Sequence, residues 1–472
     1  MQNTSQPTPI EQLANFVFDL APAHIPDVVT KQARLCILDT LGCMIAGSQT
    51  KEARALLEVE HASHGKGDST VAGSSRRLSS DAAARVNAYM GDIFELNDLI
   101  SGHASIGVVS AALAEAERLG RTAEELVLAV VAGIEVTAKV YNAFYPYLKP
   151  LDESGIVSVG MPSTIGSAAA VARLLGLTRK QTTEALAIAA ALANWCPAEV
   201  LFGSGGSVKP MMFGAMPASA GINGAKLAQA GMSGPWAILD SPIGYFNGAA
   251  TQWDGNAITS AEWALERPRR KLHACCGYIH SAFEAIVEAR HQESFKIADI
   301  ARVVVTLPAY IVPAVSKKGE PASENEARFH LQYILALALG GLDVVRPDHS
   351  AQYSEHLARP EITGFIPKIL VRSSSDLTHY HQSQIEIHFA NGQVVSRTNN
   401  RPKGSPSNPL SDDEVEEKYL SLTSPLLGSG GAVRLRDAIL DLDQQVGLEP
   451  LFGALSLAKD AESQARKSLE VN

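Results

Sequence analysis

The run Gly166-Ser-Ala-Ala-Ala-Val-Ala-Arg-Leu-Leu-Gly176 decides the fold class of this chain of 472 residues. Ala, Leu and Arg favour helix, and a Gly after the last periodic residue is typical of a helix end. Small side chains let neighbouring helices approach closely, so we expect 163–175 to be a central helix packed on all sides. The uncharged stretch 154–172 lacks the Leu and Ile density of a membrane-spanning helix, which favours a buried segment.

The sequence on both sides of this run carries the same helical period. Thr8, Thr122 and Thr178 stand at positions where a hydroxyl can cap a helix start, and Gly120 follows a periodic run in the way of a helix stop. Apolar residues that recur every three or four positions predict further helices. They cover 9–47, 80–90, 106–119, 122–144 and 178–193.

The character of the sequence changes near residue 270. Runs rich in β-branched residues predict strands at 301–307, 368–372 and 384–389. Ala390-Asn391-Gly392-Gln393 predicts a hairpin, because Asn-Gly tolerates the positive φ of a type I′ turn. After the linker at 401–409 the helical pattern resumes at Asp412 and continues to the end, with a flexible loop at Gly428-Ser-Gly-Gly-Ala. The sequence therefore predicts a mainly α protein with an α+β insertion.

Composition restricts the function classes. The net charge is −10, with 46% apolar and 19% charged residues, which is typical of a globular protein and disfavours a general nucleic-acid or membrane role. The densest basic group, Arg267, Arg269, Arg270 and Lys271, is too short for a nucleic-acid-binding arm. Five cysteines give no disulfide framework, and the polar N-terminus does not look like a signal peptide, so we expect a cytoplasmic protein.

Two motifs superficially suggest ligands. Gly203-Ser-Gly-Gly-Ser-Val-Lys209 lacks the Gly-Lys-Ser/Thr ending of a phosphate loop, and no strand precedes it. Cys275-Cys276-Gly-Tyr-Ile-His280 has adjacent cysteines that are poorly spaced for one tetrahedral zinc. We therefore expect neither nucleotide nor metal at these places.

His103 and Lys209 are the strongest candidates for proton chemistry. His103 lies in a polar loop that also contains Asn97 and Asp98, where it is either an acid/base group or a hydrogen-bonded structural His. Lys209 precedes a long uncharged stretch, so it either binds a carboxylate, acts as a base with a lowered pKa, or reaches the surface with its ammonium group.

Several segments together resemble the MmgE/PrpD family, which includes 2-methylcitrate dehydratases, cis-aconitate decarboxylases and iminodisuccinate epimerases. The resemblance follows the family order over nearly the whole chain. Its runs are 33–47, the loop from Asn97 to His103, 166–176, Lys209-Pro with 221–235, Lys271-Leu-His-Ala-Cys-Cys-Gly-Tyr-Ile-His280 and 402–410.

This resemblance implies a helical domain built from 1–268 and 406–472, an α/β lid at 269–405, a homodimer, and a site between the domains with no metal or organic cofactor. It places Asp98, His103, Lys209, Lys271, His273 and Cys275 at that site. We expect His103 to be the acid/base group, oriented by Asp98, with Lys209 and Lys271 on the substrate carboxylate and Asn97 at the substrate. Tyr145, Tyr147, Lys209 and His273 are the candidates for a second acid/base group.

The sequence also departs from the family. Many members have Asp-Asp-Thr where this chain has Asn97-Asp98-Leu99, and a His-Pro pair is absent from 156–158. We expect a hydro-lyase of the 2-methylcitrate dehydratase kind, with an epimerase of an imino or amino dicarboxylate or a cis-aconitate decarboxylase-like enzyme as alternatives. Outside enzymes, the alternative is a non-catalytic helical binding protein.

Overall fold

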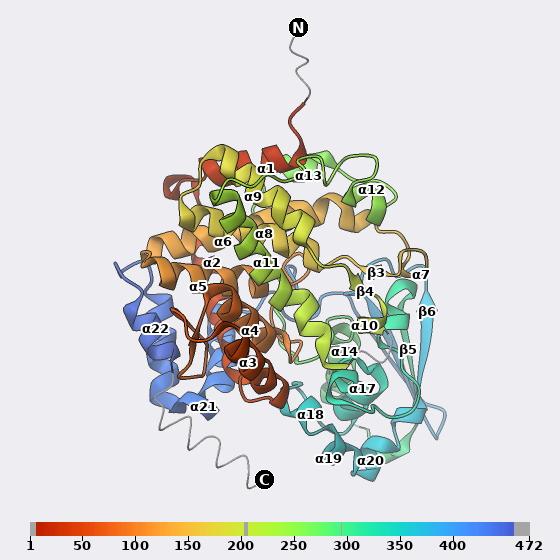
Figure 1. The fold of residues 1–472 in the computed structure, drawn as a ribbon. Coiled ribbons are helices and arrows are strands. Elements are labelled where there is room, and N and C mark those ends of the chain that lie inside the picture. Colours follow the sequence, from red (N-terminus) through yellow and green to blue (C-terminus); the bar gives the residue numbers. More distant parts are fainter. Residues whose placement is uncertain (1–5, 203–205, 294, 457–472) are drawn as a thin grey trace.

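The computed structural model describes residues 6–202, 206–293 and 295–456. Helices dominate it, and a four-stranded sheet lies at the lower right of Figure 1, so the mainly α class is confirmed. The longer helices are α1 (Pro9–Asp19), α2 (Asp27–Gly47), α3 (Lys51–His64), α4 (Ser80–Asp92), α5 (Ala104–Leu119), α6 (Ala123–Phe144), α8 (Gly160–Leu175), α9 (Arg179–Leu192), α11 (Met216–Gln229), α14 (His280–Gln292), α17 (Leu331–Leu339) and α21 (Asp412–Leu440). The short ones are α7 (Leu151–Ser154), α10 (Glu199–Phe202), α12 (Tyr245–Ala249), α13 (Gly255–Thr259), α15 (Val312–Val315), α16 (Glu324–Phe329), α18 (Asp348–Ala351), α19 (Tyr353–Leu357), α20 (Pro360–Thr363) and α22 (Glu449–Leu455).

Helix α8 is the centre of the helical part, as its small residues predict. It contacts α5, α6, α9 and α11, and nearly every residue along it is buried. Gly166 of α8 faces Gly133 of α6, and a Cβ on Gly166 would collide with the Gly133 carbonyl and the Thr137 side chain. Only glycine therefore permits this crossing.

The predicted N-terminal helix at 9–47 is in fact two helices. Thr8 caps α1 in a capping box, but Pro22 and Pro26 interrupt the helical hydrogen bonds before α2 begins at Asp27. The capping boxes at Thr122 and Thr178 are confirmed.

The sheet has the strand order β6-β5-β7-β8, in which β5 (Ile300–Pro308) pairs parallel with β6 (Ile369–Ser374). Strand β7 (Ser383–Phe389) pairs antiparallel with both β5 and β8 (Val394–Asn399). Helix α14 packs against β7 and β8, and the short pairs β1 (Ser69–Thr70) with β2 (Arg77–Leu78) and β3 (Ile156–Val157) with β4 (Cys196–Pro197) lie apart from this sheet. The three predicted strands are confirmed.

The hairpin between β7 and β8 is confirmed, but its turn type is not. Gly392 has φ 89°, whereas Asn391 has no positive φ, so the two positive φ angles of a type I′ turn are not present. The Gly392 N–H donates to the Phe389 carbonyl at 3.0 Å, and the Phe389 N–H donates to Gln393 O at 2.9 Å. This is a tight turn followed by a left-handed glycine.

The C-terminal helices pack against the N-terminal part of the chain. Helix α21 packs along α2, and Figure 1 shows the blue C-terminal helices beside the red and orange N-terminal ones. The predicted loop at Gly428 lies inside α21, where φ 67° and ψ 160° at Gly428 produce a kink instead. The division into domains at 269 and 405 stays a prediction.

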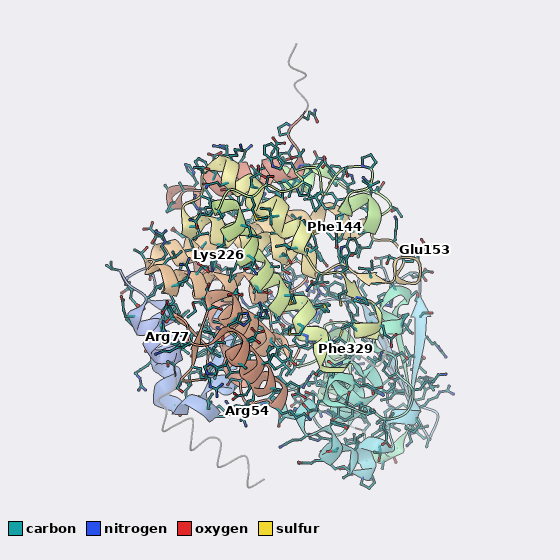
Figure 2. The ribbon with its side chains drawn as sticks, in the orientation of Figure 1. Arg54, Arg77, Phe144, Glu153, Lys226 and Phe329 are labelled. Carbon is teal, nitrogen blue, oxygen red and sulfur yellow. The ribbon has the colours of Figure 1, made fainter. Side chains whose placement is uncertain are left out.

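Helix α6 and the residues after it, Ala123–Tyr147, are long and apolar enough to cross a membrane. Of its most apolar window, 83% is buried inside the protein against neighbours such as α5 and α8. Phe144 at its end, labelled in Figure 2, is fully buried. Its ring stacks on that of Phe246, with the ring centroids 5.5 Å apart. These features are those of a core helix.

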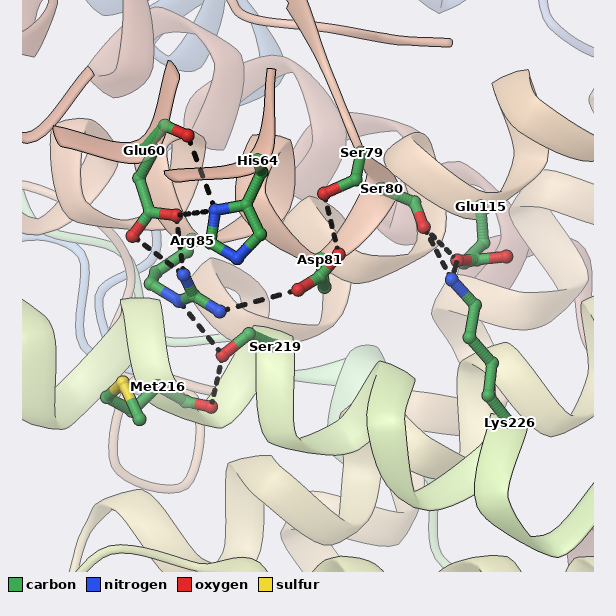
Figure 3. A network of polar contacts seen from close by, with 10 residues as sticks. All are labelled: Glu60, His64, Ser79, Ser80, Asp81, Arg85, Glu115, Met216, Ser219 and Lys226. Atoms are coloured by element: carbon green, nitrogen blue, oxygen red, sulfur yellow. Dashed lines mark hydrogen bonds and ion pairs between the residues drawn. The ribbon is translucent and has the colours of Figure 1, made fainter. Parts of the chain in front are cut away.

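Buried polar contacts fix α3, α4, α5 and α11 to one another (Figure 3). Lys226 of α11 lies 2.7 Å from both Ser80 of α4 and Glu115 of α5. Arg85 of α4 binds Glu60 of α3 at 2.6 Å. Charged groups on opposing helix faces are thus paired, which offsets much of the cost of burying them.

Candidate active site

The loop between α4 and α5 has an unusual backbone. Among the described residues, the non-glycine residues with positive φ are Glu95 (54°), Ser101 (44°) and His103 (74°), and all three lie in this loop. Gly102 between them has φ 76°. Left-handed backbone at such residues is strained and clusters at functional sites, so the loop is the first structural indication of a site.

His103 is buried and surrounded by three groups. The side-chain amide of Asn97 lies 2.9 Å from Nδ1, Oδ1 of Asp92 lies 3.8 Å from the same atom, and the Phe213 ring packs at 5.5 Å. The Asn97 amide donates to Nδ1, which leaves the ring proton on Nε2. Asn97 is therefore the group that orients His103, and the expectation that Asp98 does so is wrong.

Asp98 contacts its own loop rather than His103. Its Oδ1 accepts from the Ile100 N–H at 3.2 Å, and the Ser105 hydroxyl lies close enough to favour the ionised carboxylate. Burial, reinforced by the nearby carboxylate of Asp39, raises the pKa of Asp98 to about 6. Asp98 therefore supports the loop as a buried acid.

We expect Asp98→Asn to change how stability depends on pH. A carboxyl whose folded pKa exceeds its unfolded value stabilises the fold below pH 4, and this contribution is lost as pH rises through 6. Relative to the parent protein, the Asp98→Asn variant should gain roughly 2–3 kcal/mol of unfolding free energy between pH 4 and pH 7. Urea unfolding of both proteins at the two pH values measures this, and parallel pH curves would contradict it.

Lys209 lies between two carboxylates in the interior. It is 1% exposed, donates to both carboxylate oxygens of Asp92 at 2.9 Å, and forms an ion pair with Glu95. Although burial opposes the charge, these carboxylates raise the pKa of Lys209 above its ordinary value. Lys209 is thus a permanent buried cation, which argues against a base with lowered pKa and against a surface lysine.

The backbone after Lys209 is also irregular. Residues Met211–Ala215 form a π-helix (η4) directly before α11. Phe213 in this segment lies under the Lys209 ammonium, 4.4 Å from the ring centroid, and against His103. π-helical turns are frequent at functional sites, and this one places the Phe213 ring against both His103 and the Lys209 ammonium.

Lys271 joins the cluster through Glu95. Its Nζ donates to Glu95 Oε2 at 2.6 Å and to the Glu95 carbonyl at 2.8 Å. Despite burial, the two lysines hold the pKa of Glu95 well below its usual range. Burial raises the pKa of Asp92 to about 6. Sequence reasoning missed both acids, although two carboxylates in the apolar run 88–96 are a detectable signal.

The electrostatics keep His103 neutral. Burial, and then the charges of Lys209 and Lys271, lower the pKa of His103 well below its ordinary value. Burial also raises the pKa of Cys275 well above 9, so it is a thiol at neutral pH. Within the described part of the chain, no three His, Cys, Asp or Glu side chains are arranged to hold a metal ion.

The other residues predicted for the site, among them His273, Tyr145 and Tyr147, have neighbours of their own. The His273 ring faces α14, where it packs on His280 and Phe283 at 5.0 and 4.6 Å and its Nδ1 accepts from the Val345 N–H. Tyr145 stacks on another tyrosine, and Tyr147 lies in a short helical turn. All five cysteines are buried and unpaired. The glycine-rich run 203–209 lies partly outside the described residues.

Comparison with known proteins gives the family. An MmgE/PrpD N-terminal domain matches residues 11–256, and an MmgE/PrpD C-terminal domain matches 273–444. The chain belongs to the MmgE/PrpD family. It is 28% identical to a cis-aconitate decarboxylase-like protein of Aspergillus oryzae, oryM, over 94% of this chain and 96% of that protein. It is 25% identical to a cis-aconitate decarboxylase of Aspergillus terreus (94% and 95%) and 26% identical to that of Homo sapiens (88% and 88%).

At the position where many MmgE/PrpD proteins carry a His-Pro pair, this chain has an apolar wall. Val157, Val159 and Cys196 pack against Phe213 in one buried cluster. Val159 also lies next to Gly102, where an added Cβ would come 3.2 Å from its side chain. None of these four side chains is a His, Asp or Glu.

Proposed function

We propose that the chain is a carboxy-lyase that removes CO2 from a small di- or tricarboxylic acid of the cis-aconitate type. The observation that carries the proposal is the buried pair of cations, Lys209 and Lys271, held beside a neutral His103 in a strained loop. The full-length relatives that are named decarboxylases support this choice of reaction.

The two lysines suit the charge that develops during decarboxylation. When CO2 leaves, the bonding electrons remain on the carbon, and they spread onto a second carboxyl group if a carbon–carbon double bond connects the two. Buried ammonium groups aimed at those oxygens stabilise this charge strongly, because they need no reorganisation and little water competes. Lys209 and Lys271 are already oriented by Asp92 and Glu95.

His103 suits the protonation step. The carbanion takes one proton to form the C–H bond of the product, so that carboxylate plus proton give CO2 plus C–H. In the free protein burial and the two lysines keep His103 neutral, but a bound substrate brings negative charges that raise the pKa of the ring. Substrate binding would thereby load His103 with the proton that it delivers.

The 2-methylcitrate dehydratase-like hydro-lyase is the second candidate. Dehydration needs an acid for the leaving hydroxyl, and Asp92, with a pKa of about 6, is a carboxyl that can carry this proton near neutrality. The epimerase alternative is favoured by the stretch Ile156-Val157-Ser158, where the usual histidine is missing. A cytoplasmic homodimer remains our expectation for the assembly.

Turnover in heavy water separates these reactions. The protein is incubated with cis-aconitate, 2-methylcitrate and an iminodicarboxylate, and products are followed by proton NMR together with CO2 release. We expect CO2 and one solvent deuterium in the product from cis-aconitate. An alkene formed from the hydroxy acid without CO2 would show a hydro-lyase instead. Deuterium exchange without any change in composition would show an epimerase, and no turnover of any substrate would favour the binding protein.

A further inference from the structure

Arg269 is a buried guanidinium group without an anionic partner among the described residues. It is 6% exposed, its Nη1 makes no hydrogen bond there, and its Nη2 reaches only the Gly277 carbonyl at 3.5 Å. Burying an arginine is costly unless its charge is paired, and buried arginines are otherwise found with carboxylates. An unpaired one in the interior therefore indicates that its anion comes from outside the chain.

The surroundings of Arg269 are aromatic and uncharged. Its guanidinium lies 4.2 Å from the centroid of the Tyr380 ring. Tyr278 contacts Tyr380 and Tyr310, with ring centroids 5.5 and 6.4 Å apart, and Tyr141 stacks on Tyr145 at 4.0 Å. Burial raises the pKa of Tyr380, Tyr278 and Tyr141, so these phenols stay neutral. They offer hydroxyl donors and apolar walls but no negative charge.

This aromatic group adjoins the catalytic cluster. A Cβ placed on Gly277 would lie 3.4 Å from Arg269 Nη2 and 3.7 Å from Lys271 Cε, so the two cationic side chains flank a single point. The Tyr141 ring lies against Gly102, directly before His103. The charge of Arg269 also contributes to lowering the pKa of His103.

We propose that Arg269 binds a second carboxylate of the substrate, remote from the carboxylate held by Lys209 and Lys271. The substrate is then a polycarboxylate that spans from His103 to Arg269, and its remote carboxylate supplies the anion that the guanidinium lacks. A planar guanidinium binds a carboxylate through two parallel hydrogen bonds, which would fix both distance and orientation. This assignment rests on the proposed function, since it assumes that the His103 cluster acts on a carboxylic acid.

Equilibrium binding of non-reactive acids tests Arg269 without requiring turnover. The probes are propane-1,2,3-tricarboxylate and butanoate, which has a single carboxylate, titrated calorimetrically into the full-length protein. We expect the parent protein to prefer the tricarboxylate. In Arg269→Gln the affinity for the tricarboxylate should fall about 10- to 100-fold with little change for butanoate. Arg269→Lys keeps the charge and the fold, so its affinity for the tricarboxylate should fall less than that of Arg269→Gln.

Arg267→Gln is the matched control, because Arg267 is an exposed arginine two residues away. It should leave both affinities unchanged. If Arg269→Gln and Arg269→Lys weaken both probes equally, or neither, Arg269 has no carboxylate role and the proposal is wrong. If Arg269 sets the preference but no CO2 is released from cis-aconitate, the proposal holds and the reaction assignment fails. If the parent protein binds neither probe, both are overturned.

Discussion

Lys209→Met should reduce kcat/KM by at least about a thousandfold. In the proposed mechanism the variant removes the cation that faces the developing charge. Losing one preorganised group of this kind costs on the order of 10²–10³ in rate, with more expected where a full charge is lost. The fold should survive. Glu95 keeps its partner Lys271, and Asp92, whose pKa burial already raises to about 6, can take up a proton. Steady-state turnover of cis-aconitate, with circular dichroism on the same sample, measures both effects.

Two further variants make this result specific. Lys226→Met removes another lysine that is ion-paired with a buried glutamate, in the network of Figure 3 away from the His103 cluster, and should leave kcat within about twofold. Lys209→Arg keeps the charge but exchanges a compact ammonium for a planar fork, so it should also lose most activity. Full activity in Lys209→Met would remove Lys209 from the mechanism.

Lys418→Met should destabilise the protein by about 3–5 kcal/mol. Lys418 lies on α21, and its buried ammonium is 2.7 Å from Asp39 Oδ1 of α2. It also donates to the carbonyls of Leu96 and Lys271 at 2.7 and 2.8 Å. Without it, a buried carboxylate and two carbonyls lose their donor. Guanidinium unfolding measures the loss, and turnover should fall too, because Lys418 holds the backbone of both Lys271 and the loop before His103.

An exposed ion pair between the same two helices is the control. Lys31 of α2 pairs with Asp412 of α21, and both side chains are more than a third exposed. Lys31→Met should cost less than about 1 kcal/mol, because water solvates the remaining carboxylate. Equal losses of unfolding free energy in Lys418→Met and Lys31→Met would mean that burial of the Lys418–Asp39 pair does not matter for stability. Asp39→Asn in the Lys418→Met background should recover part of the stability.

Much of the helical architecture could be predicted because its signals are local. The hydroxyls of Thr122 and Thr178 cap helices that begin one residue later. The strands at 300–308 and 383–389 likewise follow their local patterns. The break before α2 was also locally encoded by Pro22 and Pro26, but the apolar period of 9–47 outweighed these prolines in the prediction. At Gly428 the local signal of a flexible loop was wrong, because the chain there is a kink inside α21.

The site was only partly predictable. His103, Lys209, Lys271 and Asn97 come together as the sequence suggested. Asp98 and His273 do not face the cluster, since the direction of a loop side chain depends on packing that spacing along the chain does not record. The sequence marked the basic group of Arg269 only as too short for a nucleic-acid-binding arm, and the proposed role of Arg269 came from its burial without an anionic partner among the described residues.

The sequence by itself determined the fold class, the central small-residue helix and the family resemblance, and it singled out His103, Lys209 and Lys271, whose roles at a site stay a proposal. These follow from helical period, capping residues and motif order, which are properties of neighbouring residues. Only the tertiary structure decided that Asp92 and Glu95 hold Lys209, that Asn97 orients His103, and that Lys418 and Arg269 are buried. Except for the contact between Asn97 and His103 within one loop, those facts depend on segments far apart in the chain, 117 positions between Lys209 and Asp92 and 322 between Lys418 and Leu96. The charge and solvation of a side chain are set by such distant neighbours once the fold has formed.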